Sequence, residues 1–469
     1  MSSTETVYDA IIVGAGVSGS YIANELTAAG LQCLMLEAGQ FFNRKTYPRV
    51  EVDANSQLYW GGGIELNHDA SIGLLRPKVV GGGSIVNQAL VDRFDDDALD
   101  SWREVSGIPF LSTEGLAAWY DKAESRISMQ NIPTKYRNRN AEIFRQGFDN
   151  NGYQWAPLRR AQRNCHYEDG NDCIECLWGC RIDSKQSTPV TTLRKALDRG
   201  LELIPEMEAE SVGENGDGVS VTAVSRTTGK ATFRGRRLVL ASGAIGNSKL
   251  LLQSGFAKRL PSLGHNFYAH PQYMSLAVYE EPVNAHKGPL QSLKSADPGF
   301  RRDGFKLENV YAPPAALAML VPGFGRRHQR HMKDISHCAC IEVAVRDTNP
   351  GRISLKRGGA LRIEKSLNAE DAARRDRGLK AVRNIFLSTG AREIIPGNIA
   401  ISLHIMGGCN LGTDPKRSVV SPEFRLHGYK NIYAADSSVF PNAPGINPSL
   451  TIMALSLKAA EQFLADARA

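Results

Sequence analysis

The stretch Tyr8-Asp9-Ala10-Ile11-Ile12-Val13-Gly14-Ala15-Gly16-Val17-Ser18-Gly19 decides the fold of this chain. Its apolar first half, residues 8–13, predicts a buried strand, and residues 20–29 predict a helix. A second strand is predicted over residues 31–36. The motif Gly-x-Gly-x-x-Gly stands between the first strand and the helix, so the N-terminal unit is a strand, a glycine-rich turn, a helix and a strand.

The three glycines of this motif each have a separate task in a dinucleotide site. Gly14 permits the tight turn, Gly16 lets the backbone approach a pyrophosphate, and Gly19 lets helix and strand pack closely. The helix N-terminus offers free N–H groups to the phosphates. Glu37 lies eighteen residues beyond Gly19, where a carboxylate can bind the ribose hydroxyls. The alternative is a glycine-rich turn without a ligand.

A second glycine-rich segment favours FAD over NAD as the dinucleotide. It reads Gly81-Gly82-Gly83-Ser84-Ile85-Val86-Asn87. Without side chains at the glycines, the backbone can closely approach a large flat ring. The alternative for this segment is an ordinary loop that leads into a helix.

Length, composition and charge set the broad class of the protein. With 469 residues, the chain has room for about three domain-sized units. Apolar residues make up 42% and charged residues 22%, which excludes disordered, collagen-like and coiled-coil proteins. The net charge of +7 is too small to predict a nucleic-acid partner, although it suits a phosphate-bearing cofactor or an acidic protein.

No segment of the sequence predicts a membrane span or a signal peptide. The longest apolar stretch, residues 310–324, contains three prolines, and residues 1–6 are polar. We therefore expect a cytoplasmic protein, with export alongside a partner protein left open. The basic residues after the apolar stretch predict a solvated loop or, alternatively, a surface for a small subunit, an acidic electron carrier or a membrane: Arg326, Arg327, Arg330 and Lys333.

Four cysteines are clustered within sixteen residues, with the spacing C-x7-C-x2-C-x3-C. The short gaps are those by which ferredoxin-type loops surround an iron–sulfur cluster, and a reducing compartment favours metal binding over disulfides. Zinc with the same ligands, and thiols that are unliganded or form a disulfide, are the alternatives. We predict an iron–sulfur cluster of unknown nuclearity on Cys165, Cys173, Cys176 and Cys180.

The last seventy residues contain three further motifs. They are His404-Ile405-Met406-Gly407-Gly408-Cys409, residues 428–441, and Gly445-Ile446-Asn447-Pro448-Ser449 with the apolar residues that follow. Together with residues 81–87 and the segment 241–255, they stand in the order found in the glucose-methanol-choline (GMC) oxidoreductases, and the chain resembles that family from Tyr8 to Phe463.

The resemblance implies an FAD-dependent oxidoreductase that removes a hydride from an alcohol carbon. His404 matches the family's catalytic histidine and Asn447 matches its partner. The tract from His404 to Cys409, with Asn447 and Pro448, is most similar to the cholesterol oxidase branch, whereas Asn410 departs from the commoner family tract. The resemblance also implies cofactor contacts at Gly82, Gly83, Asn87, Val212, Asp436 and Pro448.

The chemistry of these side chains supports the implied roles. Imidazole titrates near neutral pH, so His404 can act as the general base that accepts the hydroxyl proton. Asn447 is also a good N-cap with Pro448 at the first helical position, and such a helix would point its positive end at a reduced flavin. Asp436 is expected beside the ribityl chain of the flavin, with a surface turn as the alternative.

The predicted fold is α/β, with a Rossmann-like FAD-binding domain and an inserted substrate domain of antiparallel sheet and helices. The FAD-binding domain comprises residues 1–95, 189–265 and 400–469. The substrate domain comprises residues 96–188 and 266–399 and carries the cysteines. Strands over residues 338–346, 352–355 and 361–366 are expected to form the sheet below the substrate, with a helix over 369–389 behind it.

Three functions follow from these features. The leading prediction is a dehydrogenase of a small alcohol or sugar, with electrons leaving through the iron–sulfur cluster to a protein acceptor. The first alternative is an oxidase of an apolar alcohol that reduces oxygen to peroxide. The second alternative is a non-catalytic subunit that transfers electrons through a bound flavin.

Overall fold

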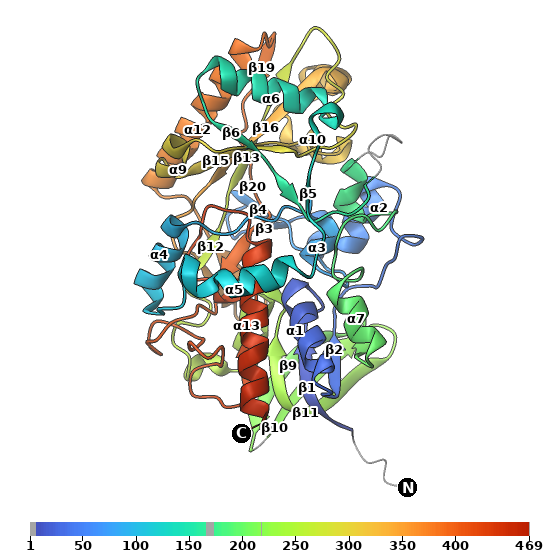
Figure 1. Ribbon diagram of the computed structural model, residues 1–469, viewed down its shortest axis with the longest axis vertical. Helices are drawn as coiled ribbons and strands as arrows, with labels where there is room; N and C mark the ends of the chain where they lie inside the picture. The colour runs from blue at the N-terminus through green and yellow to red at the C-terminus, as the bar shows by residue number, and fades with distance from the viewer. Residues whose placement is uncertain (1–5, 166–172, 217, 469) are drawn as a thin grey trace.

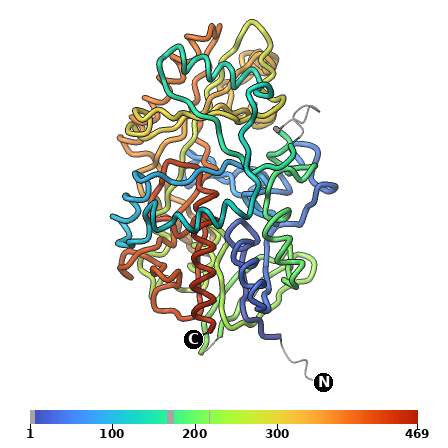
Figure 2. The backbone as a smooth tube through the Cα atoms, in the orientation of Figure 1, coloured from blue at the N-terminus to red at the C-terminus, as the bar shows by residue number. Residues whose placement is uncertain are grey.

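The computed structural model describes residues 6–165, 173–216 and 218–468, and of Cys173 it describes the backbone alone. The fold is α/β, as predicted, with two large sheets in separate halves of the molecule (Figure 1). The N-terminal and C-terminal segments lie side by side in one half (Figure 2). Segments from the beginning, middle and end of the sequence therefore build one unit.

The first sheet begins with the predicted N-terminal unit. Strand β1 (Val7–Val13) pairs in parallel with β2 (Cys33–Leu36) on one side and with β11 (Gly229–Leu240) on the other. Its residues from Ala10 onward are buried, because both faces of a parallel sheet are covered. The remaining strands are β8 (Glu202–Ile204), β22 (Ile432–Ala434), β9 (Glu208–Asn215) and β10 (Gly218–Ser225).

Helices α1 (Val17–Ala28) and α13 (Ser449–Arg468) lie side by side in front of this sheet in Figure 1, and α5 (Thr113–Glu124) runs across α13. Their contacts join the beginning, the middle and the end of the chain. The other helices of this half are α7 (Thr192–Asp198), α8 (Gly243–Gln253) and the short α3 (Gly83–Val86).

The second sheet has nine strands, and its centre is antiparallel. Strand β16 (Cys338–Val345) lies between β13 (Gln272–Val278) and β15 (Phe305–Asn309). The other strands are β3 (Glu65–Leu66), β4 (Ile72–Leu74), β6 (Trp155–Pro157), β14 (Leu293–Ser295), β19 (Glu393–Ile395) and β20 (Ala400–Ser402). Helices α12 (Ala369–Ser388) and α6 (Arg139–Asn150) pack against β15 and β16.

Side chains alternate between the two faces of this sheet. Val343 of β16 lies against Gly378 of α12, where the atom Val343 Cγ1 would be 2.4 Å from a Cβ on the glycine. The next residue toward the N-terminus, Glu342, lines the large cavity on the opposite face. This period of two places Gln272 of β13, Glu308 of β15 and Glu342 of β16 on the cavity side.

Two expectations from the sequence are wrong. Strands β17 (Arg352–Leu355) and β18 (Leu361–Glu364) form a separate hairpin and do not join the nine-stranded sheet. The chain leaves the sheet after β16, and the N–H of Ile353 donates to the carbonyl of Gly264, at 2.7 Å, on the side of α8. The basic segment forms helix α11 (Gly325–Lys333), not a loop, with cationic side chains in its last turn that interact favourably with the helix dipole.

Three strands of the second sheet come from segments that were expected elsewhere. Strands β3, β4 and β20 fall within the ranges predicted for the FAD-binding domain, yet they pair in the second sheet. The predicted domain boundaries stay a prediction. Further elements are α2 (Glu51–Leu58), α4 (Asp96–Ser106), α9 (Pro298–Arg302), α10 (Pro314–Leu320), β5 (Gln130–Asn131), β7 (Arg159–Arg160), β12 (Phe267–Ala269) and β21 (Ile405–Gly407).

None of the helices in the described part of the chain has the length and the hydropathy to cross a bilayer.

A buried aromatic cluster fixes the segment that precedes α13. The Trp102 ring lies 4.5 Å from the Phe440 ring and 5.2 Å from the Phe94 ring, measured between centroids. The indole N–H of Trp102 donates to the carbonyl of Asn442 at 3.1 Å. Because Asn447 follows five residues later, this packing helps to position it.

We predict that Trp102→Ala lowers the free energy of unfolding by about 3–5 kcal/mol, because the large side chain is fully buried and leaves a cavity. The control is Phe324→Ala, since 91% of the Phe324 side chain is exposed, and the expected change is within about 0.5 kcal/mol. Urea denaturation of both variants measures the difference. Equal stability of the two variants would contradict the prediction.

Candidate active site

The turn between β1 and α1 has the geometry that the glycine motif predicts. Gly14 has φ +108°, and a Cβ there would lie 2.4 Å from the carbonyl oxygen of Ala241. A Cβ on Gly19 would lie 2.0 Å from the Gly14 oxygen, so helix and strand pack without a side chain between them. Gly16, like Gly14 and unlike Gly19, lines the cavity. Its backbone is open to a ligand.

Helix α3 meets this turn at a second glycine. Gly82 has φ +51°, and a Cβ there would lie 2.8 Å from the Cα of Gly16. No described atom lies within 4 Å of the position of a Cβ on Gly83. Gly82, Gly83 and Asn87 all line the same cavity as Gly16. The two glycine-rich turns thus form one continuous backbone cradle.

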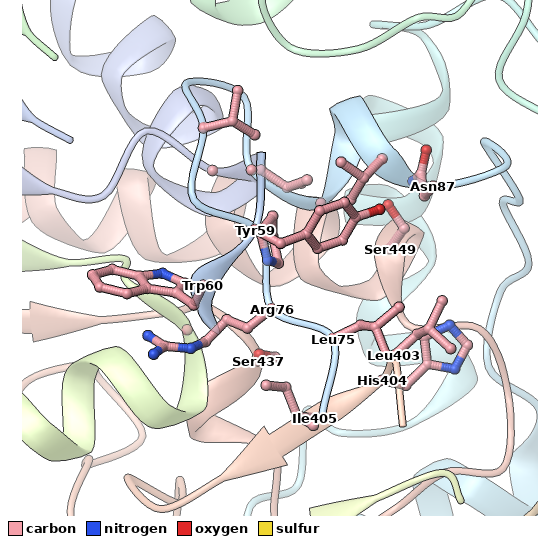
Figure 3. A pocket seen from close by; sticks show the side chains of 18 of the residues that line it. Tyr59, Trp60, Leu75, Arg76, Asn87, Leu403, His404, Ile405, Ser437 and Ser449 are labelled. Carbon is pink, nitrogen blue, oxygen red and sulfur yellow. The ribbon is translucent and has the colours of Figure 1, made fainter. Parts of the chain in front are cut away.

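The cavity has a volume of about 450 Å³ and extends from this cradle to the second sheet. In Figure 3, Asn87 and His404 lie on one side of it, and Trp60 and Arg76 lie on the opposite side. Several residues predicted to bind the cofactor or substrate line it: Gly14, Gly16, Glu37, Gly82, Gly83, Asn87, His404, Asp436, Asn447 and Pro448.

Polar groups at the start of α1, as well as the glycines, suit a bound dinucleotide. Ser18, at the start of α1, lines the cavity, and its hydroxyl is buried with no hydrogen-bond partner among the described residues. A hydroxyl beside free N–H groups at a helix N-terminus suits a phosphate oxygen. Ser18 was not predicted from the sequence, although it stands inside the glycine motif.

Glu37 is buried at the end of β2. Its Oε2 accepts from the N–H of Ala15 and its Oε1 accepts from the N–H of Gly39, both at 2.8 Å. Burial raises the pKa of this carboxyl, and the two N–H donors oppose the shift. Each oxygen keeps capacity for another hydrogen bond, so the carboxylate can hold the turn and also accept from ribose hydroxyls.

Asp436 is buried, so the alternative of a surface turn is wrong. Its carboxylate accepts from the N–H of Gly243 at 2.6 Å, from the Asn247 amide at 2.9 Å, and from the N–H of Ser438 at 2.8 Å. Burial raises its pKa, and these donors oppose the rise. Asp436 thus joins the start of α8 to the C-terminal segment at the cavity wall.

Two of the residues predicted to bind the cofactor lie outside the cavity lining. Gly19 has the packing role described above. The N–H of Val212 on β9 donates to the hydroxyl of Ser254 at 2.9 Å, and earlier residues of the same region line the cavity instead: Met207, Glu208 and Ala209. The cofactor contact at Val212 stays a prediction, and Val212 lies farther along β9 than the residues that line the cavity.

Trp60 and Arg76 were missed by the sequence analysis. Both line the cavity, and the Arg76 guanidinium lies 4.4 Å from the centroid of the Trp60 ring. Lys78 lies at the same distance and Lys249 at 5.9 Å. Arg76 is paired with Glu65 at 2.8 Å and Lys249 with Glu208 at 2.9 Å, so the charges of these two cations are balanced. The only signal in the sequence was the pair of cations that flanks Pro77 before the second glycine segment.

His404 lies between β20 and β21 and contacts a second histidine that was not predicted. Nδ1 of His270 lies 3.1 Å from Nδ1 of His404. The backbone N–H of His270 donates to the backbone carbonyl of His404, also at 3.1 Å. On its other side, Nε2 of His270 accepts from the N–H of Gly445 at 2.9 Å. His270 therefore joins His404 to the loop that carries Asn447.

Both imidazoles are neutral at pH 7. Burial, followed by the charge of Lys306, lowers the pKa of His404 to about 4. Burial, followed by His404, lowers the pKa of His270 well below its ordinary value.

The hydrogen bonds assign the position of each imidazole proton. Because Nε2 of His270 accepts from Gly445, the single proton of His270 stands on Nδ1. That proton is donated to Nδ1 of His404, so the proton of His404 stands on Nε2. In this resting state His404 offers a hydrogen-bond donor at Nε2, not an acceptor.

Asn447 is oriented by a buried lysine. Lys306 of β15 donates from Nζ to Oδ1 of Asn447, so the Asn447 amide group Nδ2H₂ is left to donate elsewhere. The ammonium group of Lys306 also contacts Glu308 and lies 3.7 Å from Asp92. Burial alone would lower the pKa of Lys306, but these two carboxylates raise it, so the lysine is charged. His404 and Asn447 thus share one positive neighbour.

The cysteine segment borders the same cavity. The short 3-10 helix η4 (Cys173–Trp178) packs against α3, and its last residues, Leu177 and Trp178, line the cavity. The Cys176 thiol hydrogen bonds to Cys180 and lowers the pKa of Cys180 to about 5, against the opposing effect of burial. Lys185 Nζ donates to the carbonyl of Asn87 at 2.9 Å, which ties this segment to the end of α3.

Of the four predicted metal ligands, Cys165, Cys176 and Cys180 have side chains among the described residues, and Cys176 hydrogen bonds to Cys180. No group of three or more histidine, cysteine, aspartate or glutamate side chains among those residues could hold a metal ion. The side chain of Cys173 and residues 166–172 lie outside the described residues. The described cysteines do not by themselves fit an iron–sulfur cluster, and the cluster stays a prediction. The other four cysteines, Cys33, Cys338, Cys340 and Cys409, are buried in the core as expected.

Comparison with known proteins gives the family. Models described as GMC oxidoreductase match residues 8–272 and residues 347–456. An uncharacterised GMC-type oxidoreductase of Sinorhizobium fredii is 28% identical, over 97% of this chain and 94% of its own length. A long-chain-alcohol oxidase of Arabidopsis thaliana is 25% identical, over 96% of this chain and 67% of its own length.

A solved structure shares the fold. The pyridoxine 4-oxidase from Mesorbium loti matches with a TM-score of 0.77 over 98% of this chain and 99% of that chain, at 16% identity. Since the two family models together match more than half of the sequence, the chain belongs to the GMC oxidoreductases, which are FAD-dependent oxidoreductases that act on CH–OH donors.

Proposed function

We propose that this protein oxidises the CH–OH group of a small alcohol to a carbonyl group, with FAD in the backbone cradle. The observation that carries the proposal is that one cavity is lined by His404, Asn447, Gly82, Gly83 and Asn87. FAD, when bound, supplies the chemistry of a hydride acceptor. Gly14, Gly16, Glu37, Gly82, Gly83, Asn87, Asp436 and Ser18 are the residues that would hold it.

The chain's own contribution concerns the oxygen of the substrate. His404 Nε2–H and Asn447 Nδ2H₂ are both donors, and both residues border the cavity. Two fixed donors stabilise the negative charge that the oxygen carries after the hydroxyl proton has been lost to solvent and before the hydride leaves the carbon. The charge of Lys306 behind Asn447 acts in the same direction. The site therefore suits an alkoxide-like oxygen.

The role of His404 as general base requires a different tautomer. His404 would then carry its proton on Nδ1 and donate it to His270, which would leave Nε2 free to accept the hydroxyl proton. His270 would have to carry its own proton on Nε2, against the N–H of Gly445. The donor role and the base role thus require the protons of His404 and His270 on opposite ring nitrogens.

We predict that His404→Gln keeps much more activity than His404→Ala, because the glutamine amide retains a donor but cannot act as a base. The measurement is the rate at which an alcohol bleaches the visible absorbance of the flavin without oxygen. Removal of one such donor costs about 10² to 10³ in rate. Equal losses in the two variants would instead support the general base.

We predict that Lys306→Met moves the acid limit of kcat/KM to higher pH. The base role needs a neutral imidazole, so in that role activity is lost only as the pH falls through the His404 pKa of about 4. Without the lysine charge, burial alone depresses this pKa, and the acid limit moves toward the ordinary value of 6.5. The variant Lys294→Met, which removes the other cation beside Asp92 but keeps Lys306, is the control. An unchanged acid limit in Lys306→Met contradicts the prediction.

The electron acceptor separates two forms of the proposal. In the dehydrogenase form, the cysteine segment carries electrons from the cavity to a protein acceptor, which its contact with α3 supports. In the oxidase form, oxygen is the acceptor, as the printed name of the Arabidopsis relative states for that protein. Alcohols bleach the flavin in both forms. A non-catalytic subunit, in contrast, is not reduced by any alcohol.

We predict that the dehydrogenase form contains iron and reduces a dye much faster than oxygen. Cys180→Ser then lowers the iron content and the rate of dye reduction, while bleaching of the flavin by an alcohol in the absence of oxygen is unchanged. Metal analysis and absorption spectra before and after dithionite check this result. A protein without iron that produces one peroxide for each carbonyl product is the oxidase.

A further inference from the structure

The floor of the cavity contains two buried carboxyl groups that the proposed reaction does not use. Glu308 and Glu342 lie directly opposite each other on β15 and β16, and both line the cavity. Their exposed fractions are 1% and 4%. Buried carboxyls are rare unless they have partners or a function.

Most charges around this floor are balanced in pairs. Lys294 lies 2.6 Å from Asp92, and Lys306 contacts Glu308. Lys294 and Lys306 thus neutralise Asp92 and Glu308. Among the described residues, no cation forms an ion pair with Glu342. Burial and the neighbouring Glu308 raise the pKa of Glu342 well above its ordinary value, against the opposing charge of Lys306. Both effects favour the protonated carboxyl, which can donate a hydrogen bond to Glu308 or to a ligand.

Gln272 of β13 adds an unused acceptor to the same floor. It lines the cavity and is 4% exposed. Its Nε2 donates to Oε1 of Glu342 at 3.4 Å. Its Oε1 has no hydrogen-bond partner among the residues that the structure describes. A buried acceptor of this kind inside a cavity indicates a donor that arrives with a ligand.

We propose that Gln272, Glu308 and Glu342 form a subsite for a second hydroxyl group of the substrate, so that the substrate is a polyol and not a monofunctional aliphatic alcohol. This inference rests on the proposed function, because the first hydroxyl binds at His404 and Asn447. The second hydroxyl donates to Oε1 of Gln272 and accepts from the carboxyl of Glu342. A hydroxyl can do both at once, since it has one donor and two acceptor positions.

The charge balance selects a neutral group at this subsite. With Glu342 protonated, two lysines face two carboxylates, and no net charge remains to attract an ammonium group. An ammonium group would also meet the positive charge of Lys306. An aliphatic alcohol, in turn, would leave Gln272 Oε1 buried without a donor. Sites that hydrogen bond a substrate hydroxyl strongly reject analogues that lack it.

The test compares n-butanol, glycerol, sorbitol and ethanolamine as reductants of the flavin in the holoenzyme. We expect Glu342→Leu to lower kcat/KM for glycerol and sorbitol by about tenfold to a hundredfold, and to change that for n-butanol by less than about threefold. Glu342→Gln is expected to keep the preference for polyols, because an amide is neutral and retains a donor and an acceptor. Glu280→Leu, at an exposed glutamate outside the cavity, is the control.

A second readout does not depend on turnover. Sorbitol is expected to raise the thermal unfolding temperature of the native holoenzyme and of Glu342→Gln, but not that of Glu342→Leu. The subsite is refuted if Glu342→Leu lowers kcat/KM equally for n-butanol and for the polyols, because the carboxyl would then act in a step common to all alcohols. It is also refuted if ethanolamine is preferred over glycerol. If no alcohol bleaches the flavin, the proposed function itself fails.

Discussion

The contact between two glycine turns is the constraint on which the rest of the structure depends. A Cβ on Gly82 would lie 2.8 Å from the Cα of Gly16, so a side chain there would force the turn after β1 away from α3. Both turns line the cavity, and the cradle exists only while they touch. Glu37 and Asp436 then attach the neighbouring loops to this cradle through backbone N–H groups, which gives the cofactor site its fixed shape.

The reacting end of the cavity is assembled where the two halves of the molecule meet. His404 stands between β20 of the second sheet and β21, and Asn447 directly precedes the helix α13 that packs on the first half. Lys306 reaches Asn447 from the second sheet. Substrate and cofactor groups therefore come from different parts of the chain. The hydrogen bonds of His270 and Lys306 link these parts of the chain to each other.

The ionisable groups at this end of the cavity either favour their uncharged form or are paired with an opposite charge. Burial lowers the pKa of His404 and of His270 and raises that of Glu342, so it favours the uncharged form of all three, while two lysines are matched by two carboxylates. Donors that are held in place by such contacts stabilise a negative charge on an oxygen. Its proton positions are set by a chain of hydrogen bonds that ends at the backbone of Gly445.

The sequence by itself determined the α/β class and the two glycine turns, and it predicted His404 and Asn447 as the reacting pair, because glycine spacing and motif order are local properties of the chain. It did not place β17 and β18 outside the main sheet, show that Val212 lies beyond the cavity, or find His270, Lys306, Trp60 and the floor of Gln272, Glu308 and Glu342. These features depend on strand pairing and on contacts between residues more than a hundred positions apart, such as His270 with His404. Only the tertiary structure decides which of many similar polar residues is buried beside the reacting oxygen.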